Sequence, residues 1–397
     1  MTSRLRIVVG GYLGLLPAGG VTWDYLQYPL GLAEMGCDVY YLEDTRLWPV
    51  YKDSGDASDA SENVAHLAEV MQAFGLENRW AYRDEASAKC FGLSEPQLQA
   101  ICRTADVFLN ISCSTVMRDE YHRIPVRALV DSDPMFTQMQ LQKGEGFTVG
   151  DSNLRELVDA HTHHFTFGES FGTSPCRIPD CGVHWHPTRQ PITLRHWPVS
   201  APPPPHAAYT TVMNWSSAPP VRWQGVDWGQ KDVELLKILD LPASVPEISL
   251  AVAVGQTTGA RFPTEQAARH GWTLLDPTCC AGDWRRYRNF IRGSRGELSV
   301  AKETYVKART GWFSCRSACY LASGRPVVTQ ETGWSRHIPA GEGLFAFNDK
   351  AEAAEALRCI ERDWDEHSRA ARRIAEEHFA SETVLRELLG NLGVWPE

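Results

Sequence analysis

The stretch GWFSCRSACYLASGRPVVTQETG, residues Gly311–Gly333, sets the expected fold of this chain. Its order predicts a loop, a short helix over 313–324 that stops at Gly324, a buried strand over 325–330 and a second loop. A glycine after the last helical turn and a β-branched run behind it are typical of a helix that leads into a strand. The stretch therefore indicates an α/β domain.

The same alternation continues on both sides of this stretch. Apolar runs separated by helical patterns predict parallel sheets with crossover helices, and Ser61 is a suitable cap for one of these helices. The predicted strands are 4–10, 37–44, 105–112, 124–134, 208–215, 247–255, 272–277 and 296–301. The predicted helices are 19–36, 61–76, 231–242 (ended by Pro242), 264–271 and 283–294, followed by two or three helices within 350–392.

A proline run divides these patterns into two sets. The run APPPPHA, Ala201–Ala207, is stiff and reads as a connector. We therefore predict two doubly wound, Rossmann-like domains that face a central cleft, because ligands of such sheets bind at the carboxyl ends of the strands. The expected parts are an acceptor-side domain 1–200, a linker 201–208, a nucleotide-sugar-binding domain 209–375 and a C-terminal helix 376–397 that can pack back on the N-terminal domain.

Composition excludes some classes of partner. The chain has 397 residues, 43% of them hydrophobic, and a formal net charge of −10, which disfavours a nucleic-acid backbone as the main partner. It contains no run of 18 apolar residues, so no transmembrane segment is expected. The start imitates an export signal, but its glycines break the apolar run. Eleven cysteines without a convincing export signal predict mostly free thiols and a cytoplasmic location.

The stretch around Gly324 resembles the donor-binding segment of GT-B fold glycosyltransferases, most closely the retaining nucleotide-sugar enzymes. Residues 371–389 and 10–44 resemble the last helices and the first strand, glycine loop and helix of that group, whereas 131–228 matches nothing we can place. The residues in register with the family pattern are Phe313, Leu321, Ala322, Gly324, Pro326, Val327, Val328, Gly333, Gly341, Gly343 and Leu344.

The resemblance implies a glycosyltransferase that moves a sugar from a nucleotide-diphosphate sugar to an acceptor. It implies no metal and no cofactor beyond this co-substrate. The chain departs from the family in one respect, because the two glutamates that the family usually carries fall here at Gly311 and Cys319. One of these glutamates binds the donor ribose and the other lies near the reacting sugar. Donor identity and the stereochemical outcome therefore stay open.

A nucleotide-sugar site must neutralise a diphosphate, which helix N-termini and arginines do well. Ser314 is expected to cap the helix over 313–324, and Arg316 in its first turn is expected to bind phosphate. A surface arginine paired with a carboxylate is the alternative. Further donor-binding predictions are Arg222, Lys231, Lys302, Glu331, Thr332, Gly333 and, in the first glycine loop, Gly19 and Gly20.

Carboxylates and metal ligands are less clearly marked. Asp131 and Asp133, at the end of a predicted strand, and Glu169 are candidates for orienting an acceptor hydroxyl or acting as a base. The two aspartates could equally cap the following segment. Cys176, Cys181, His184 and His186 are four possible zinc ligands, but their C-x4-C and H-x-H spacings depart from the usual pattern. No metal is therefore expected, although the sequence leaves zinc binding by these residues open. The glycine loop also lacks the dinucleotide fingerprint spacing.

Three functions stay open at this stage. The leading one is sugar transfer from a nucleotide sugar to a small-molecule or glycan acceptor. The second is a nucleotide-sugar epimerase or phosphorylase with the same fold. The third is a nucleotide-sugar-binding protein without catalysis, which stays open because the two glutamates are missing. The sequence specifies neither the acceptor nor the oligomeric state.

Overall fold

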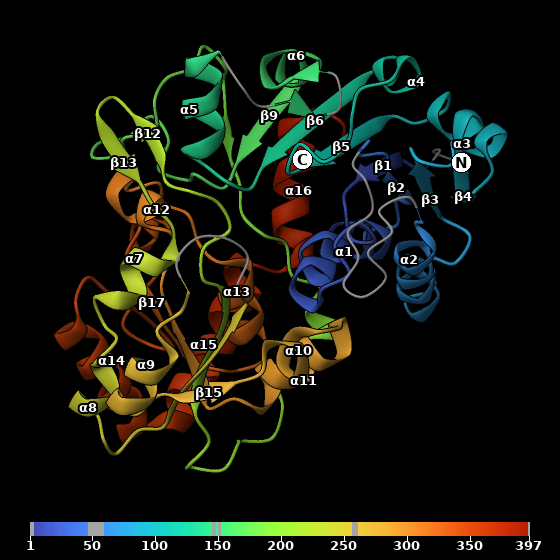
Figure 1. Ribbon diagram of the computed structural model, residues 1–397. Coiled ribbons are helices and arrows are strands. Elements are labelled where there is room, and N and C mark those ends of the chain that lie inside the picture. Colours follow the sequence, from blue (N-terminus) through green and yellow to red (C-terminus); the bar gives the residue numbers. More distant parts are fainter. Residues whose placement is uncertain (1–3, 47–58, 145–147, 150–151, 256–260, 396–397) are drawn as a thin grey trace. The chain divides into compact units, whose positions relative to one another are not determined.

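The structure, a computed structural model, describes residues 4–46, 59–144, 148–149, 152–255 and 261–395. The chain forms two compact units (Figure 1). The N-terminal domain comprises Met1–Phe167, Pro179–Thr193 and Ser381–Glu397, and the C-terminal domain comprises Gly168–Ile178 and Leu194–Ala380. These limits differ from the prediction of one linker at 201–208 between the two domains. Arg325 Nη2 donates to the Ala201 carbonyl at 2.9 Å, which holds the proline-rich run within the C-terminal domain.

The N-terminal domain is built on an eight-stranded sheet in the order β10-β9-β6-β5-β1-β2-β3-β4. Neighbouring strands run parallel except β3 and β4. Its strands are β1 (Arg6–Gly10), β2 (Asp38–Glu43), β3 (Trp80–Asp84), β4 (Lys89–Gly92), β5 (Val107–Ile111), β6 (Val126–Asp131), β9 (His163–Thr166) and β10 (His186–Pro187), with β7 (Thr148–Val149) and β8 (Ser152–Asn153) in a separate pair.

The helices of this domain include the last helix of the chain. α16 (Ser381–Asn391, red) lies beside α1 (Gly19–Glu34, blue) in Figure 1. The two helices approach closely at Gly31, where an added Cβ would lie 2.7 Å from Leu385 Cδ1 and Ser381 Cβ. The remaining helices are α2 (Ser61–Ala73), α3 (Glu95–Cys102), α4 (Asp119–His122), α5 (Phe136–Lys143) and α6 (Leu154–Asp159).

The C-terminal domain is built on a six-stranded parallel sheet in the order β15-β14-β11-β16-β17-β18. This is the 3-2-1-4-5-6 order of a Rossmann sheet, whose topological switch point lies between its first and fourth strands. The strands are β11 (Tyr209–Asn214), β14 (Leu250–Gly255), β15 (Thr273–Leu275), β16 (Gly296–Ser299), β17 (Val327–Gln330) and β18 (Leu344–Phe347), with β12 (Val221–Trp223) and β13 (Val226–Trp228) forming a hairpin.

Nine helices of this domain are described. They are α7 (Lys231–Leu236), α8 (Leu241–Ser244), α9 (Thr264–His270), α10 (Pro277–Ala281), α11 (Trp284–Gly293), α12 (Glu303–Ala308), α13 (Cys315–Ala322), α14 (Lys350–Arg362) and α15 (Trp364–His378). The short 3-10 helices are η1 (Leu194–His196) and η2 (Trp334–Arg336). Apolar side chains of β11, β14 and α14 form a continuous core, which includes Tyr209, Val252 and Leu357.

Two local predictions are wrong. α2 begins at Ser61, with Ala60 as its cap residue, and the Asp59 carboxylate accepts the Ser61 N–H at 2.9 Å. Pro242 does not end a helix, because it lies in the first turn of α8, where the missing N–H costs nothing.

The predicted α/β class with two parallel-sheet domains is confirmed. In the described part of the chain, no helix combines the length and the apolar character that a membrane crossing requires.

Candidate functional site

The switch point of the C-terminal sheet organises the candidate site. β11 and β16 pair only at Tyr209–Gly296 and Thr210–Glu297, so the two strands diverge toward their carboxyl ends. In doubly wound domains, ligands bind at the carboxyl ends of the strands beside such a switch point. The residues that follow β16 and β17, together with the start of α13, surround this edge.

Arg316 fills the gap between the diverging strands. Its guanidinium donates to the Val212 carbonyl of β11 at 2.7 Å, and to Glu297 Oε1 and Ser299 Oγ of β16 at 2.5 Å each. Burial lowers the pKa of Arg316, but the Glu297 carboxylate more than offsets this effect and holds that pKa above its ordinary value. The side chain that we expected to bind phosphate is thus engaged inside the domain.

Ser314 occupies the cap position of α13 but makes no capping bond with its side chain. Its backbone is extended (φ −73°, ψ 128°), and its carbonyl accepts the Ala318 N–H at 3.1 Å. The positive end of this eight-residue helix is therefore not covered by its own cap side chain. A helix N-terminus in this condition suits an anionic ligand.

The loop after β17 packs against the loop before α13. Thr332 Oγ1 donates to the Trp312 carbonyl at 2.6 Å, and the Gly311 N–H donates to the Thr332 carbonyl at 2.8 Å. Glu331 accepts the Gly333 N–H, which turns its carboxylate toward its own loop. Gly333 has φ +102°, and an added Cβ there would lie 3.1 Å from the Arg309 carbonyl. The structure thus brings the predicted residues 331–333 next to the start of α13.

A segment from the middle of the chain joins these loops. Residues 168–178 leave the N-terminal sheet after β9 and belong to the C-terminal domain. The Ser170 N–H donates to the Thr310 carbonyl at 3.0 Å, and the Arg177 N–H donates to the Ala308 carbonyl at 2.7 Å. Glu169, a predicted carboxylate of the site, is 9% exposed in this segment. It therefore lies in the same domain as the predicted donor residues Ser314, Arg316 and 331–333.

Arg309 was missed by the sequence analysis. It ends α12 in the left-handed conformation (φ 51°), which is uncommon for a residue other than glycine. Within the described residues its guanidinium makes no hydrogen bond or ion pair, and the side chain is partly exposed. No sequence motif marks it, apart from its place two residues before Gly311. It is a cation beside the loop 310–313 before α13 and the loop 331–333 after β17, which we call the switch-point loops.

The other predicted cations separate into two places. Lys231 begins α7 and Lys302 caps α12, and the two helix starts are joined by the Glu303 N–H, which donates to the Gln230 carbonyl at 3.2 Å. Lys302 Nζ also lies 5.3 Å from the centre of the Tyr305 ring. Arg222, by contrast, is exposed on the hairpin β12–β13, where it pairs with Asp227 at 3.0 Å.

Asp131 and Asp133 belong to the N-terminal domain and differ in burial. Asp131 is 2% exposed, and its carboxyl group accepts bonds from Thr137 Oγ1, Gln138 Nε2 and Thr166 Oγ1 at 2.6 to 2.9 Å. Burial raises its pKa above the usual range. These bonds fix the start of α5, as the capping alternative anticipated, while Asp133 is exposed.

Gly19 and Gly20 are the first two residues of α1 in the N-terminal domain. The preceding glycine loop is bound by Glu43, a residue that the sequence analysis did not single out. The Glu43 carboxyl group accepts the N–H groups of Gly14 at 2.5 Å and Leu15 at 2.9 Å, and burial raises its pKa to about 7. The loop N–H groups that could bind a phosphate therefore bind the Glu43 carboxyl group instead.

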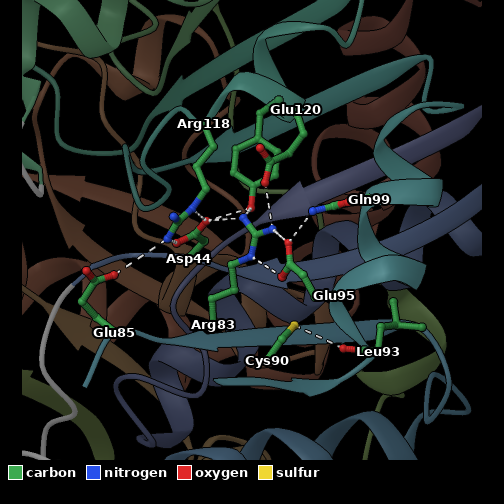
Figure 2. A network of polar contacts seen from close by, with 10 residues as sticks. Asp44, Arg83, Glu85, Cys90, Leu93, Glu95, Gln99, Arg118 and Glu120 are labelled. Carbon is green, nitrogen blue, oxygen red and sulfur yellow. Dashed lines mark hydrogen bonds and ion pairs between the residues drawn. The ribbon is translucent and has the colours of Figure 1, made fainter. Parts of the chain in front are cut away.

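A charged cavity of about 650 Å³ lies at the carboxyl ends of β2 and β3. Two of its lining residues, Arg83 and Arg118, donate to the buried Asp44 carboxylate at 3.0 Å and 2.6 Å, as Figure 2 shows. Burial raises the pKa of Asp44, but these arginines hold it below its usual range. Arg83 also pairs with Glu120 at 2.8 Å. The charges on the cavity walls therefore largely compensate one another.

The four possible zinc ligands form no metal-binding cluster among the described residues. Across the described residues, no group of three or more His, Cys, Asp or Glu side chains could hold a metal ion. Cys181 Sγ accepts the Trp185 Nε1–H at 3.4 Å, and the rings of His184 and His186 stack edge to face at 4.6 Å. These contacts give three of the four residues a packing role, while Cys176 lies in the segment 168–178 of the C-terminal domain.

Comparison with known proteins identifies the fold. No protein-family model matches the chain, and no curated protein matches its sequence. Solved structures do match over nearly the whole chain. An alpha-glucosyltransferase in complex with UDP and a 13-mer DNA containing a central A:G mismatch has a TM-score of 0.56 at 11% identity, covering 99% of this chain and 100% of the other.

Two further structures are similar over the same extent. AviGT4, a glycosyltransferase involved in avilamycin A biosynthesis, has a TM-score of 0.52 at 12% identity, covering 98% of this chain and 97% of the other. Sucrose-phosphate synthase from Thermosynechococcus elongatus has a TM-score of 0.50 at 10% identity, covering 98% of each chain. The chain therefore has the GT-B fold of glycosyltransferases, which confirms the resemblance seen in the sequence, in a divergent form.

Proposed function

We propose that this protein is a glycosyltransferase that moves a sugar from a nucleotide-diphosphate sugar to a small-molecule or glycan acceptor. The observation that carries the proposal is the switch point of the C-terminal sheet. There the N-terminus of α13, which its cap side chain does not bond, the partly exposed Arg309 and the paired loops at Gly311 and Gly333 come together in a GT-B fold. The structures that share this fold include complexes with UDP and UDP-glucose, which supports a nucleotide-sugar ligand.

The chemistry of transfer requires stabilisation of a diphosphate leaving group. The N–H groups and dipole of a helix N-terminus provide part of it, and an arginine can add two parallel bonds to phosphate oxygens. We assign these roles to the start of α13 and to Arg309, with Lys302 and Lys231 as further cations. Fixed charges and dipoles of this kind stabilise the transition state without a metal ion.

The acceptor is expected to be neutral or small. One similar structure is bound to DNA, but this chain carries a net charge of −10, which opposes a polyanionic acceptor.

The direct test is thermal unfolding of the full chain with UDP-, GDP-, dTDP- and ADP-glucose, each with and without EDTA. A nucleotide sugar at one hundred times its Kd stabilises the folded state by about 2.7 kcal/mol. We expect one nucleotide to raise the Tm equally in the presence of EDTA. If none of the four raises the Tm, the proposal fails, and a shift that EDTA abolishes refutes metal independence.

Arg309→Ala provides a residue-level test with a matched control. It should weaken nucleotide affinity roughly ten- to a hundredfold, the range expected for a charge-assisted bond of about 1.5–3 kcal/mol. Arg309→Lys should recover part of the loss. The control is Arg369→Ala, which removes an exposed arginine paired with Glu366 on α15 of the same domain. Equal effects of the two alanine variants would contradict the role of Arg309.

A binding protein without turnover is the second candidate, and the absence of glutamates at positions 311 and 319 favours it. Cys319 is 2% exposed inside α13, so no ligand reaches it without rearrangement. Release of free nucleotide diphosphate from the bound sugar nucleotide separates the candidates. A transferase releases it with an acceptor or slowly with water, whereas a binding protein returns the sugar nucleotide intact.

A further inference from the structure

The position of Gly311 explains why this chain has no acidic side chain there. Gly311 has φ +80°, a conformation that side chains other than glycine rarely adopt. An added Cβ would lie 2.6 Å from Ser170 N and 2.7 Å from Ser170 Oγ. The space that a side chain of residue 311 would occupy is thus filled by the segment 168–178. A side chain that contacts a ligand at this position therefore belongs to the segment 168–178 and not to residue 311.

Two bonds hold the segment in place at this point. The Ser170 N–H donates to the Thr310 carbonyl at 3.0 Å, and Ser170 Oγ lies 2.9 Å from His337 Nε2, just after η2. Ser170 Oγ also lies 3.3 Å from where a Cβ of Gly333 would be. Ser170 is therefore fixed against both switch-point loops, and the residue before it is positioned with it.

That residue is Glu169, which is 9% exposed. An ionised carboxylate repels a diphosphate but accepts strong bonds from neutral hydroxyl groups. A nucleotide-diphosphate sugar offers hydroxyl groups on its ribose and its sugar, and Arg309 and the start of α13 suit the diphosphate between them. Glu169 directly precedes Ser170, whose N–H bonds to the Thr310 carbonyl at 3.0 Å. A carboxylate carried by this segment complements a hydroxyl-bearing end of such a ligand.

Building on the proposed function, we propose that Glu169 is the carboxylate that binds hydroxyl groups of the transferred sugar, supplied by the segment 168–178 in place of a side chain at position 311. Ser170 and His337 are positioning residues, because they fix the backbone of Glu169 without themselves needing to touch the sugar. The ligand class is a neutral hexose attached to a nucleotide diphosphate.

The test compares the binding of UDP with that of UDP-glucose by calorimetry, or of the matching pair if another nucleotide is selected. Glu169→Gln should weaken UDP-glucose binding at least tenfold and leave UDP binding within about twofold. Glu366→Gln, which changes a partly exposed glutamate of α15, is the control and should alter the affinity for neither ligand. If Glu169→Gln leaves the ratio of the UDP-glucose and UDP affinities unchanged, whether both fall equally or neither falls, the inference is overturned.

Two further variants keep the inference testable if Glu169→Gln folds poorly. Ser170→Ala removes the bond to His337 and should also lower the affinity for UDP-glucose relative to that for UDP, by a smaller factor than Glu169→Gln. Gly311→Ala should do so as well, because its Cβ displaces Ser170. If both variants fold and keep the wild-type ratio of UDP-glucose affinity to UDP affinity, the inference is refuted. Failure of the wild-type protein to bind any nucleotide refutes the proposed function instead, so the two failures are distinguishable.

Discussion

The substitution Arg316→Ala separates the role that the sequence predicts for this residue from the role that the structure gives it. The structure places the guanidinium against Glu297, which is 0% exposed and whose Oε2 has no hydrogen-bond partner among the described residues. Removing one member of a buried ion pair leaves a charge without compensation. The expected loss of stability is roughly 3–5 kcal/mol.

This loss is large enough to measure in the melting temperature. For domains of about 150–250 residues, 1 kcal/mol shifts the Tm by roughly 2–4 °C, so Arg316→Ala should lower it by roughly 6–20 °C. The double variant Arg316→Met with Glu297→Gln removes both charges and should recover most of the loss, because the uncompensated charge is gone. Urea unfolding of the two variants beside the wild type provides the free energies of unfolding.

The opposite pattern would refute this reasoning. If Arg316→Ala unfolds within about 1 kcal/mol of the wild type and loses nucleotide affinity, the arginine binds phosphate directly, as the sequence alone indicates. If the double variant is as unstable as the single one, the ion pair is not the source of the loss.

Two further predictions concern the N-terminal domain. Glu43 has a pKa raised to about 7 by burial, so its contribution to stability is fully present below about pH 4.5 and is lost as pH rises through 7. Unfolding measured from pH 4.5 to 8 should show a decline on the order of 3 kcal/mol that Glu43→Gln abolishes, and parallel profiles would contradict this. Gly31→Ala should cost about 1–3 kcal/mol because its methyl group meets α16, and an unchanged Tm would show that the α1–α16 contact is looser than described.

The sequence was sufficient for the local elements around α13 and β17. The predicted helix 313–324 and strand 325–330 contain the observed α13 and β17, because a glycine stop and a β-branched run determine them locally. The two-domain α/β class followed from the same periodic patterns. The β-strands β3 and β4 were missed, because they are short and their run carries no clear alternation.

The features that the sequence did not predict depend on contacts between distant residues. Nothing local shows that residues 168–178 join the C-terminal domain, since the bonds that attach them to it, at Thr310 and Ala308, reach more than a hundred positions along the chain. The first-turn position of Arg316 suggested a ligand, but the divergence of β11 from β16 is a property of the sheet. Glu43 and Arg309 were overlooked because no motif marks a buried carboxyl group or a left-handed arginine.

The most direct test of the central claim is hydrogen exchange of the full chain with and without saturating UDP-glucose. The account places the sugar nucleotide at the switch point of the C-terminal sheet, so amides of residues 309–316 and 331–337 should exchange more slowly when it is bound. Ser170 and its neighbours should be protected as well. Protection confined to the N-terminal domain, or none at any concentration of UDP-glucose or of the other three sugar nucleotides, would contradict the account.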